Sequence, residues 1–219
     1  MAAEPGPKAM HAARIAGAIR RVPVWSVYAL GSLPILLLGV EAATRGLGAD
    51  PVKRIEHALG LAALQFLLAG LAVTPILRFW GVNLIRFRRA LGLLAFGHAA
   101  LHVAVWMMLD LQLRWSEIAA DLTRRPYIVA GMVAFMLLIP LAATSNDSAL
   151  RRLGALRWRR LHRLVYPAVL LAGVHHLLSF KVWTVESVAY FSVGAGLLAL
   201  PRPGGGAAAE LARGKVTGM

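Results

Sequence analysis

Histidine is the residue type in this sequence with the widest scope for chemistry. The chain has seven histidines and no cysteine. Without cysteine there is no thiolate catalysis, no disulfide and no cysteine-ligated metal. A metal or redox centre therefore requires histidine or another ligand that is not a thiolate, with methionine a weaker option. His11 lies in a polar N-terminal segment, but the others lie in or at the ends of long apolar stretches: His57, His98, His102, His162, His175 and His176. Ionisable side chains in such stretches are costly and are candidates for function.

The stretches that carry these histidines are long enough to cross a membrane. Hydrophobic residues make up 58% of the chain, and the mean hydropathy is +0.65. A membrane-spanning helix needs about 20 mainly apolar residues, with about 17 as a minimum. Six segments qualify: 24–40, 58–77, 90–109, 127–143, 161–180 and 182–200. We therefore predict an all-α fold, a polytopic membrane helix bundle of about six transmembrane helices.

The charged residues predict how the bundle is oriented. The net charge is +14, from 24 Lys and Arg against 10 Asp and Glu, and the charges cluster between the apolar stretches. A nucleic-acid-binding protein would instead spread its basic residues over helix faces. Counted on alternate sides of the six spans, 17 basic residues fall on one side and 7 on the other. The positive-inside rule makes the first side cytoplasmic. We expect a cytoplasmic segment over 1–23, a transmembrane domain over 24–200 and a disordered cytoplasmic tail over 201–219.

Two histidines are predicted to lie at the same depth in the membrane. At a rise of 1.5 Å per residue, His102 is about 18 Å along the third span and His175 about 21 Å along the fifth, and both spans run outward. Two imidazoles from two helices at one depth are what a haem iron with two axial histidines requires. Zinc is usually bound by three or four closely spaced protein ligands. The pair predicts an outer-leaflet haem b site.

His162 indicates a second position near the inner side. It precedes His175 by 13 residues, or about 20 Å along a helix. On an ideal helix that spacing leaves the two side chains about 140° apart, so His176 shares the face of His162 better unless Pro167 bends the helix. The spacing therefore leaves open whether His175 or His176 is the ligand of the outer haem. On the third span Arg88 occupies the place where an inner partner histidine would stand, and it suits a haem propionate or an unusual axial role.

Short motifs spread over residues 25–200 resemble one family. They are Leu47-Gly48-Ala49-Asp50-Pro51-Val52-Lys53 with His57, Arg88-Arg89-x-Leu91-Gly92-Leu93, Leu101-His102, Arg125-Pro126-Tyr127, Leu141-Ala142-x-Thr144-Ser145, Arg152-Leu153-Gly154, Trp158-x-x-Leu161-His162-x-x-Val165-Tyr166, and His175 with Ser179 and Lys181. Together these motifs resemble the haem-binding membrane subunits of the periplasmic protein-methionine-sulfoxide reductase system, within the ferric-reductase-like transmembrane group.

The resemblance implies an electron conduit of the bacterial inner membrane with one or two b haems. His102, His162 and His175 are then the haem-iron histidines, with Arg88 a further cofactor-binding residue where the wider group carries a histidine. Electrons would come from the quinone pool or a cytosolic flavin reductase. They would pass to a periplasmic molybdopterin-dependent methionine sulfoxide reductase, which repairs oxidised periplasmic proteins. FMN is also associated with the family, and no motif here marks its site.

On this interpretation the chain is an electron-transfer subunit of an oxidoreductase complex, with no substrate-reducing site of its own. The outer loops over 46–56 and 110–126 are the expected docking surfaces for the acceptor. One alternative is a cytochrome b that serves another acceptor, such as a ferric reductase. A more distant one is a metal or proton transporter that uses the same histidines, although transporters usually place Asp or Glu within the spans. We predict no nucleic-acid partner.

Overall fold

The computed structural model describes residues 17–19, 21–180 and 182–200, and these residues form helices joined by short turns. The predictions for His11, Lys181 and the tail over 201–219 fall outside the described residues. The helices in chain order are α2 (Val24–Gly31), α3 (Leu33–Thr44), α4 (Pro51–Trp80), η1 (Ile85–Phe87), α5 (Arg88–Val105), η2 (Trp106–Asp110), α6 (Trp115–Arg124), α7 (Pro126–Ala143), α8 (Asp147–Leu161), η3 (His162–Leu164), α9 (Val165–Leu178) and α10 (Val185–Ala199).

The predicted membrane bundle is confirmed. Five helical stretches in the described part of the chain are long and apolar enough to cross a membrane, and α10 is a shorter apolar helix of 15 residues. The first span is interrupted at Ser32, between α2 and α3. Pro34 stands in the first turn of α3, and its missing N–H cannot continue the hydrogen bonds of α2.

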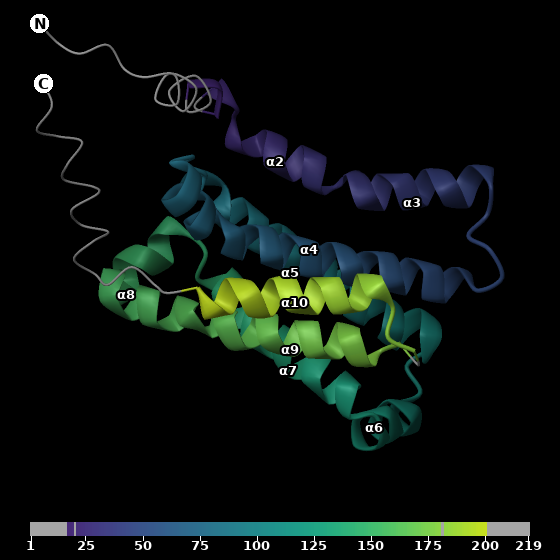
Figure 1. The fold of residues 1–219 in the computed structure, drawn as a ribbon. Coiled ribbons are helices and arrows are strands. Elements are labelled where there is room, and N and C mark those ends of the chain that lie inside the picture. The colour runs from purple at the N-terminus through teal and green to yellow at the C-terminus, as the bar shows by residue number, and fades with distance from the viewer. Residues whose placement is uncertain (1–16, 20, 181, 201–219) are drawn as a thin grey trace, which may run out of the picture.

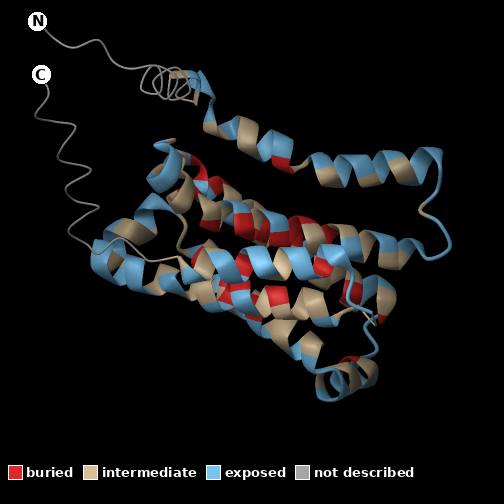
Figure 2. Cartoon of the chain, in the orientation of Figure 1, coloured by how far each residue is buried: buried red, intermediate tan, exposed pale blue. Residues whose placement is uncertain are grey.

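The long helices run alongside one another, and α6 and α8 lie at opposite ends of the bundle (Figure 1). We refer to these as the α6 end and the α8 end. Apolar residues form the core where α4, α5, α7 and α9 meet: Leu64, Leu67, Leu68, Leu71, Ala95, Leu138, Leu141, Ala168 and Val169. Figure 2 shows the buried residues gathered along these inner faces, while the outward faces are exposed. Many of the exposed residues are large and apolar, Leu36 and Val193 among them, as expected of a surface in contact with lipid.

Two helices were not predicted, because a search for long apolar stretches misses amphipathic helices. At one end, α6 packs Ile118 against Trp106 and Leu111. At the other, α8 carries much of the basic charge, and the Asn146 side chain caps it by accepting a hydrogen bond from the Ala149 N–H at 2.7 Å. The predicted loop over 110–126 is thus mostly helical.

Candidate functional site

The structure brings His102 and His175 together near the α6 end of the bundle. His102 lies in the last turn of α5, and His175 in the last turn of α9. Their ring centroids are 6.1 Å apart, and the ring planes are inclined at 73°. A five-residue π-helical turn, η2, follows α5 directly and begins four residues after His102. Such turns are frequent at functional sites because they alter the direction of the side chains around them.

Each of these two imidazoles is held by a backbone carbonyl of a neighbouring helix. Nδ1 of His102 lies 2.8 Å from the Glu56 carbonyl oxygen on α4, and Nδ1 of His175 lies 2.8 Å from the Tyr127 carbonyl oxygen on α7. A carbonyl only accepts hydrogen bonds, so Nδ1 must carry the proton and donate it in both residues. The proton on Nδ1 leaves the Nε2 lone pair of each neutral ring available to a metal, as in histidines that ligate metals.

Two glycines make room for the rings. A Cβ atom on Gly60 would lie 3.1 Å from Cε1 and Nδ1 of His102, and one on Gly131 would lie 2.6 Å from Nδ1 of His175. Gly60 follows Glu56 by four residues on α4, and Gly131 follows Tyr127 by four on α7. In both places the imidazole therefore packs over a glycine and donates to the carbonyl one helical turn before it.

This geometry fits a metal held by two histidines on opposite sides. A metal bonded to both rings at about 2.0 Å would separate the ring centres by roughly 6 Å. Among the described residues no group of three or more His, Cys, Asp or Glu could hold a metal ion. A tetrahedral zinc site needs more ligands than this part of the chain brings together, whereas two histidines are a ligand set that haem iron uses.

The structure places the His175 ring, and not the His176 ring, beside His102. The 3₁₀ turn η3 does not account for this choice. Its three residues add about 60° of rotation to both positions, which leaves His176 about 20° and His175 about 80° from the face of His162. His176 instead has its ring 5.8 Å from Tyr190 of α10.

His162 is placed differently from the other two. Its ring stacks on Trp158, with centroids 3.7 Å apart, and its Nε2 lies 3.2 Å from the Thr144 hydroxyl. That hydroxyl donates to the Pro140 carbonyl at 2.6 Å, so it accepts from Nε2–H. Nε2 of His162 therefore carries the proton and offers no lone pair to a metal, unlike Nε2 of His102 and His175.

The arginines near His162 are tied to other groups. Arg88 donates to the Thr74 hydroxyl at 3.4 Å, and Arg89 pairs with Asp147 at 2.6 Å. The structure thus places Arg88 at the same end of the bundle as His162 without a direct partnership between them.

The two remaining intramembrane histidines have other ring partners. His98 is 2% exposed, donates from Nδ1 to the Leu94 carbonyl of its own helix and packs on Phe66. His57 lies beside Phe180. Sequence reasoning missed the roles of Gly60 and Gly131. Each glycine follows by four residues the residue whose carbonyl accepts the hydrogen bond. Because every residue has a backbone carbonyl, the sequence does not show which carbonyl binds the histidine.

The fold is a membrane helix bundle, and the comparisons with known proteins assign it to the ferric-reductase type and support a role in membrane electron transfer. Residues 56–173 match the family described as Ferric reductase like transmembrane component. The chain is 49% identical over 175 residues to the protein-methionine-sulfoxide reductase heme-binding subunit MsrQ of Brucella ovis, and equally to that of Brucella abortus. It is 47% identical to that of Brucella anthropi, and each alignment covers 80% of this chain and 79% of the relative.

The chain therefore belongs to the family of protein-methionine-sulfoxide reductase heme-binding subunits, the MsrQ family. It is a multi-pass membrane protein.

Proposed function

We propose that this chain holds haem b between His102 and His175 and carries electrons across a bacterial inner membrane. The observation that carries the proposal is the 6.1 Å separation of two imidazoles whose Nδ1 atoms both donate to carbonyls. A bound haem would supply one-electron redox chemistry. The chain's own part is to fix the tautomer of both histidines, to leave the Nε2 lone pair of each ring free and to hold the two rings together within the helix bundle.

The charge distribution supports an orientation with the α8 end in the cytoplasm. Asp147 is the one acidic residue near that end in the described part of the chain, against a large set of arginines on α8 and on the α4–α5 turn. The α6 end carries acids and bases together, including the Lys53–Asp110 pair at 2.8 Å. The positive-inside rule then makes the α6 end periplasmic, which places the histidine pair on the periplasmic side.

Electrons come from membrane quinol or a cytosolic flavin reductase and leave to a periplasmic molybdopterin-dependent methionine sulfoxide reductase. The family supports a methionine sulfoxide reductase as the acceptor, since the relatives are named as heme-binding subunits of a protein-methionine-sulfoxide reductase. The acceptor docks at the α6 end, where residues of α6 and of the α3–α4 turn are exposed and where the last turns of α5 and α9 carry the histidine pair. His162 and Arg88, at the α8 end, form the candidate position for a second haem. Ligation there requires the Thr144 hydroxyl to release Nε2 of His162.

An absorption spectrum of the purified protein tests the proposal. We expect a Soret band and a dithionite-reducible α-band of b type, and a pyridine-haemochrome assay gives the number of haems per chain. A well-folded protein that contains no haem would refute the electron-transfer function. Reconstitution with the purified reductase subunit then tests the acceptor: electrons from the reduced chain should reach methionine sulfoxide only when both subunits are present.

A further inference from the structure

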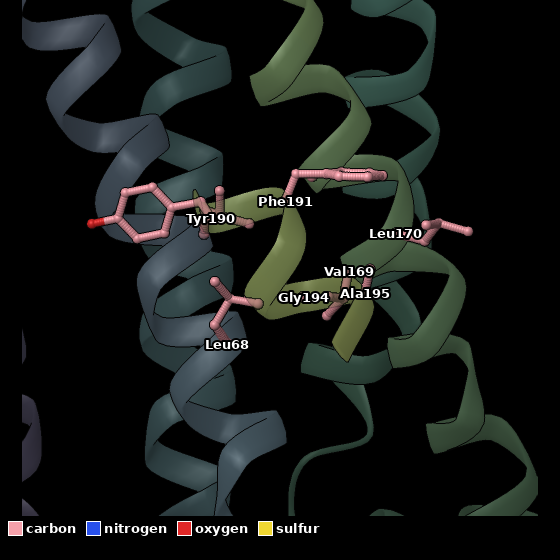
Figure 3. A pocket seen from close by; sticks show the side chains of 9 residues that line it. Leu68, Val169, Leu170, Tyr190, Phe191, Gly194 and Ala195 are labelled. Carbon is pink, nitrogen blue, oxygen red and sulfur yellow. The ribbon is translucent and has the colours of Figure 1, made fainter. Parts of the chain in front are cut away.

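Most of α4 is held in the bundle by apolar packing. A narrow gap between α4, α9 and α10 is lined mainly by apolar side chains such as Leu68 and Val169, and no charged residue lies along it (Figure 3). A Cβ on Gly194 would lie 3.3 Å from Leu68 Cδ2, so α10 packs closely on α4 at this point. The first two turns of α4 differ, because a charged side chain there links α4 to η2.

One lysine joins two carboxylates from different helices at the α6 end. Lys53 Nζ donates to Glu56 Oε2 on α4 at 3.0 Å and to Asp110 Oδ2 in η2 at 2.8 Å. We call these three residues the Lys53 triad. The Glu56 side chain is only 13% exposed and that of Asp110 26%. An isolated surface ion pair contributes little to stability, whereas linked pairs that are partly buried are less screened and contribute more.

The triad lies on the face of α4 that contacts His102. Asp50 caps this helix by accepting a hydrogen bond from the Lys53 N–H at 3.0 Å, which fixes where α4 begins. Lys53, Glu56 and Gly60 then follow at spacings of three and four residues, which places them on one face of the helix. The Glu56 carbonyl accepts the Nδ1 proton of His102, and Gly60 lies under the ring.

Asp110 makes the same link from the helix that carries His102. It lies eight residues after His102, in the π-helical turn that continues α5. In a straight α-helix it would lie about 80° around the axis from His102. A π-helical turn winds less per residue, because its hydrogen bonds span five residues, and so it rotates Asp110 back toward the face of His102. The triad thus joins the helix of His102 to the helix whose carbonyl binds its ring.

His175 has no counterpart of this link. Helices α7 and α9 contain no Asp, Glu, Lys or Arg, so no ion pair can join them to each other. They meet through the apolar core, where α7 contributes Leu138 and Leu141 and α9 contributes Ala168 and Val169. The two histidines share a carbonyl and a glycine, but only His102 has an ion-paired link between its two helices.

We infer that Lys53 is a positioning residue for His102. By binding Glu56 and Asp110 together, it holds the accepting carbonyl of α4 close to the helix that carries the ring. Without this link the first turns of α4 can move away from η2, and His102 then loses the acceptor that fixes its orientation and tautomer. The inference rests on the proposed function, because the position of His102 matters in this way only if the ring binds haem iron.

Haem titration of the purified, full-length protein in lipid nanodiscs tests the inference. Lys53→Met and Asp110→Ala should each weaken haem affinity by about three- to tenfold, less than the roughly 10- to 100-fold typical of groups that bind a ligand histidine directly. Part of the ferric haem should change from six-coordinate low-spin to five-coordinate high-spin, and added imidazole should reverse this change. Lys53→Arg keeps the charge and the donors, so it should restore both the affinity and the low-spin spectrum.

Three comparisons separate positioning from charge and from general stability. Lys53→Met removes a positive charge and Asp110→Ala a negative one, so an effect of charge through space would change haem affinity in opposite directions, whereas a broken link weakens it in both. The double variant should lose no more than the worse single variant, because one link is broken only once. Arg54→Met is the matched control. Arg54 pairs with Glu41 of α3 at 3.0 Å, and removing that pair should leave haem binding unchanged.

Low-spin haem of full affinity in both Lys53→Met and Asp110→Ala would overturn the positioning role. Opposite effects of these two variants, additive losses in the double variant, or an equal loss in Arg54→Met would also overturn it. Circular dichroism verifies that each variant is folded, and if Lys53→Met is not, Asp110→Ala decides by the same criteria. If the protein without any substitution binds no haem, the proposed function is overturned instead.

Discussion

His102 and His175 come from helices far apart in the chain, yet their rings lie 6.1 Å apart in matching surroundings. Each ring donates from Nδ1 to a carbonyl at 2.8 Å and packs over the glycine four residues further along that helix. The helix pairs α4–α5 and α7–α9 thus hold their histidines by the same arrangement of a carbonyl and a glycine. Because both tautomers are fixed by the backbone, neither ring needs to reorient before it binds a metal.

The first prediction concerns the two ligands themselves. His102→Ala and His175→Ala should each lower the haem content of the purified protein by more than about tenfold, since each removes one of two axial ligands. His98→Ala is the matched control from the same helix as His102 and should keep most of the haem. The pyridine-haemochrome assay measures all three. Full haem content in either ligand variant would contradict the assignment.

The second prediction concerns the glycine under His175. Gly131→Ala places a Cβ 2.6 Å from Nδ1, which forces the ring or α7 to move. We expect haem affinity to fall by about 10- to 100-fold, as for the loss of other groups that orient a ligand. Gly60→Ala should have a smaller effect, because its Cβ would lie 3.1 Å from the His102 ring.

Gly97→Ala provides the control for both glycine variants. A Cβ at Gly97 meets nothing within 4 Å, and alanine favours a helix over glycine by about 1 kcal/mol, so haem binding should be preserved. Haem titration of the apoproteins gives the affinities, and circular dichroism verifies the helices. Equal haem affinity in the Gly131 and Gly97 variants would show that the close contact has no role.

The third prediction separates the two ends of the bundle. His162→Ala removes a ring that stacks on Trp158 and is hydrogen-bonded to Thr144, at the opposite end from the histidine pair. The haem between His102 and His175 should therefore remain, and its reduced α-band should persist. If His162 also holds a haem, the haem count per chain should fall from two to one. Complete loss of haem would mean that the two ends are not independent.

The fourth prediction concerns orientation in the membrane, and the lack of cysteine makes it simple to test. Ser116 on α6 and Ser148 on α8 are both exposed, so each can be replaced by a single cysteine. In intact spheroplasts a membrane-impermeant maleimide should label Ser116→Cys and leave Ser148→Cys unlabelled until the membrane is opened. The reverse pattern would place the α6 end in the cytoplasm, against the positive-inside rule.

The sequence by itself determined the membrane class, the approximate spans and the histidines that are candidates for function. These follow from composition and from one-dimensional spacing, because a helix must be about 20 apolar residues long to cross a bilayer and an ionisable residue within it is costly. The equal depth of His102 and His175 in the membrane also followed from the sequence, by counting residues along the two predicted spans. The family resemblance was confirmed by the comparisons.

Only the tertiary structure decided which face each histidine presents. Ideal helix geometry put His176 rather than His175 on the face of His162, yet the structure places the His175 ring beside His102 and the His176 ring beside Tyr190. The carbonyls of Glu56 and Tyr127 and the space above Gly60 and Gly131 come from neighbouring helices, so local sequence carries no sign of them. A search for apolar stretches also does not find α6 and α8, because these helices are amphipathic. Their stability comes from where they pack, and packing is a property of the whole bundle.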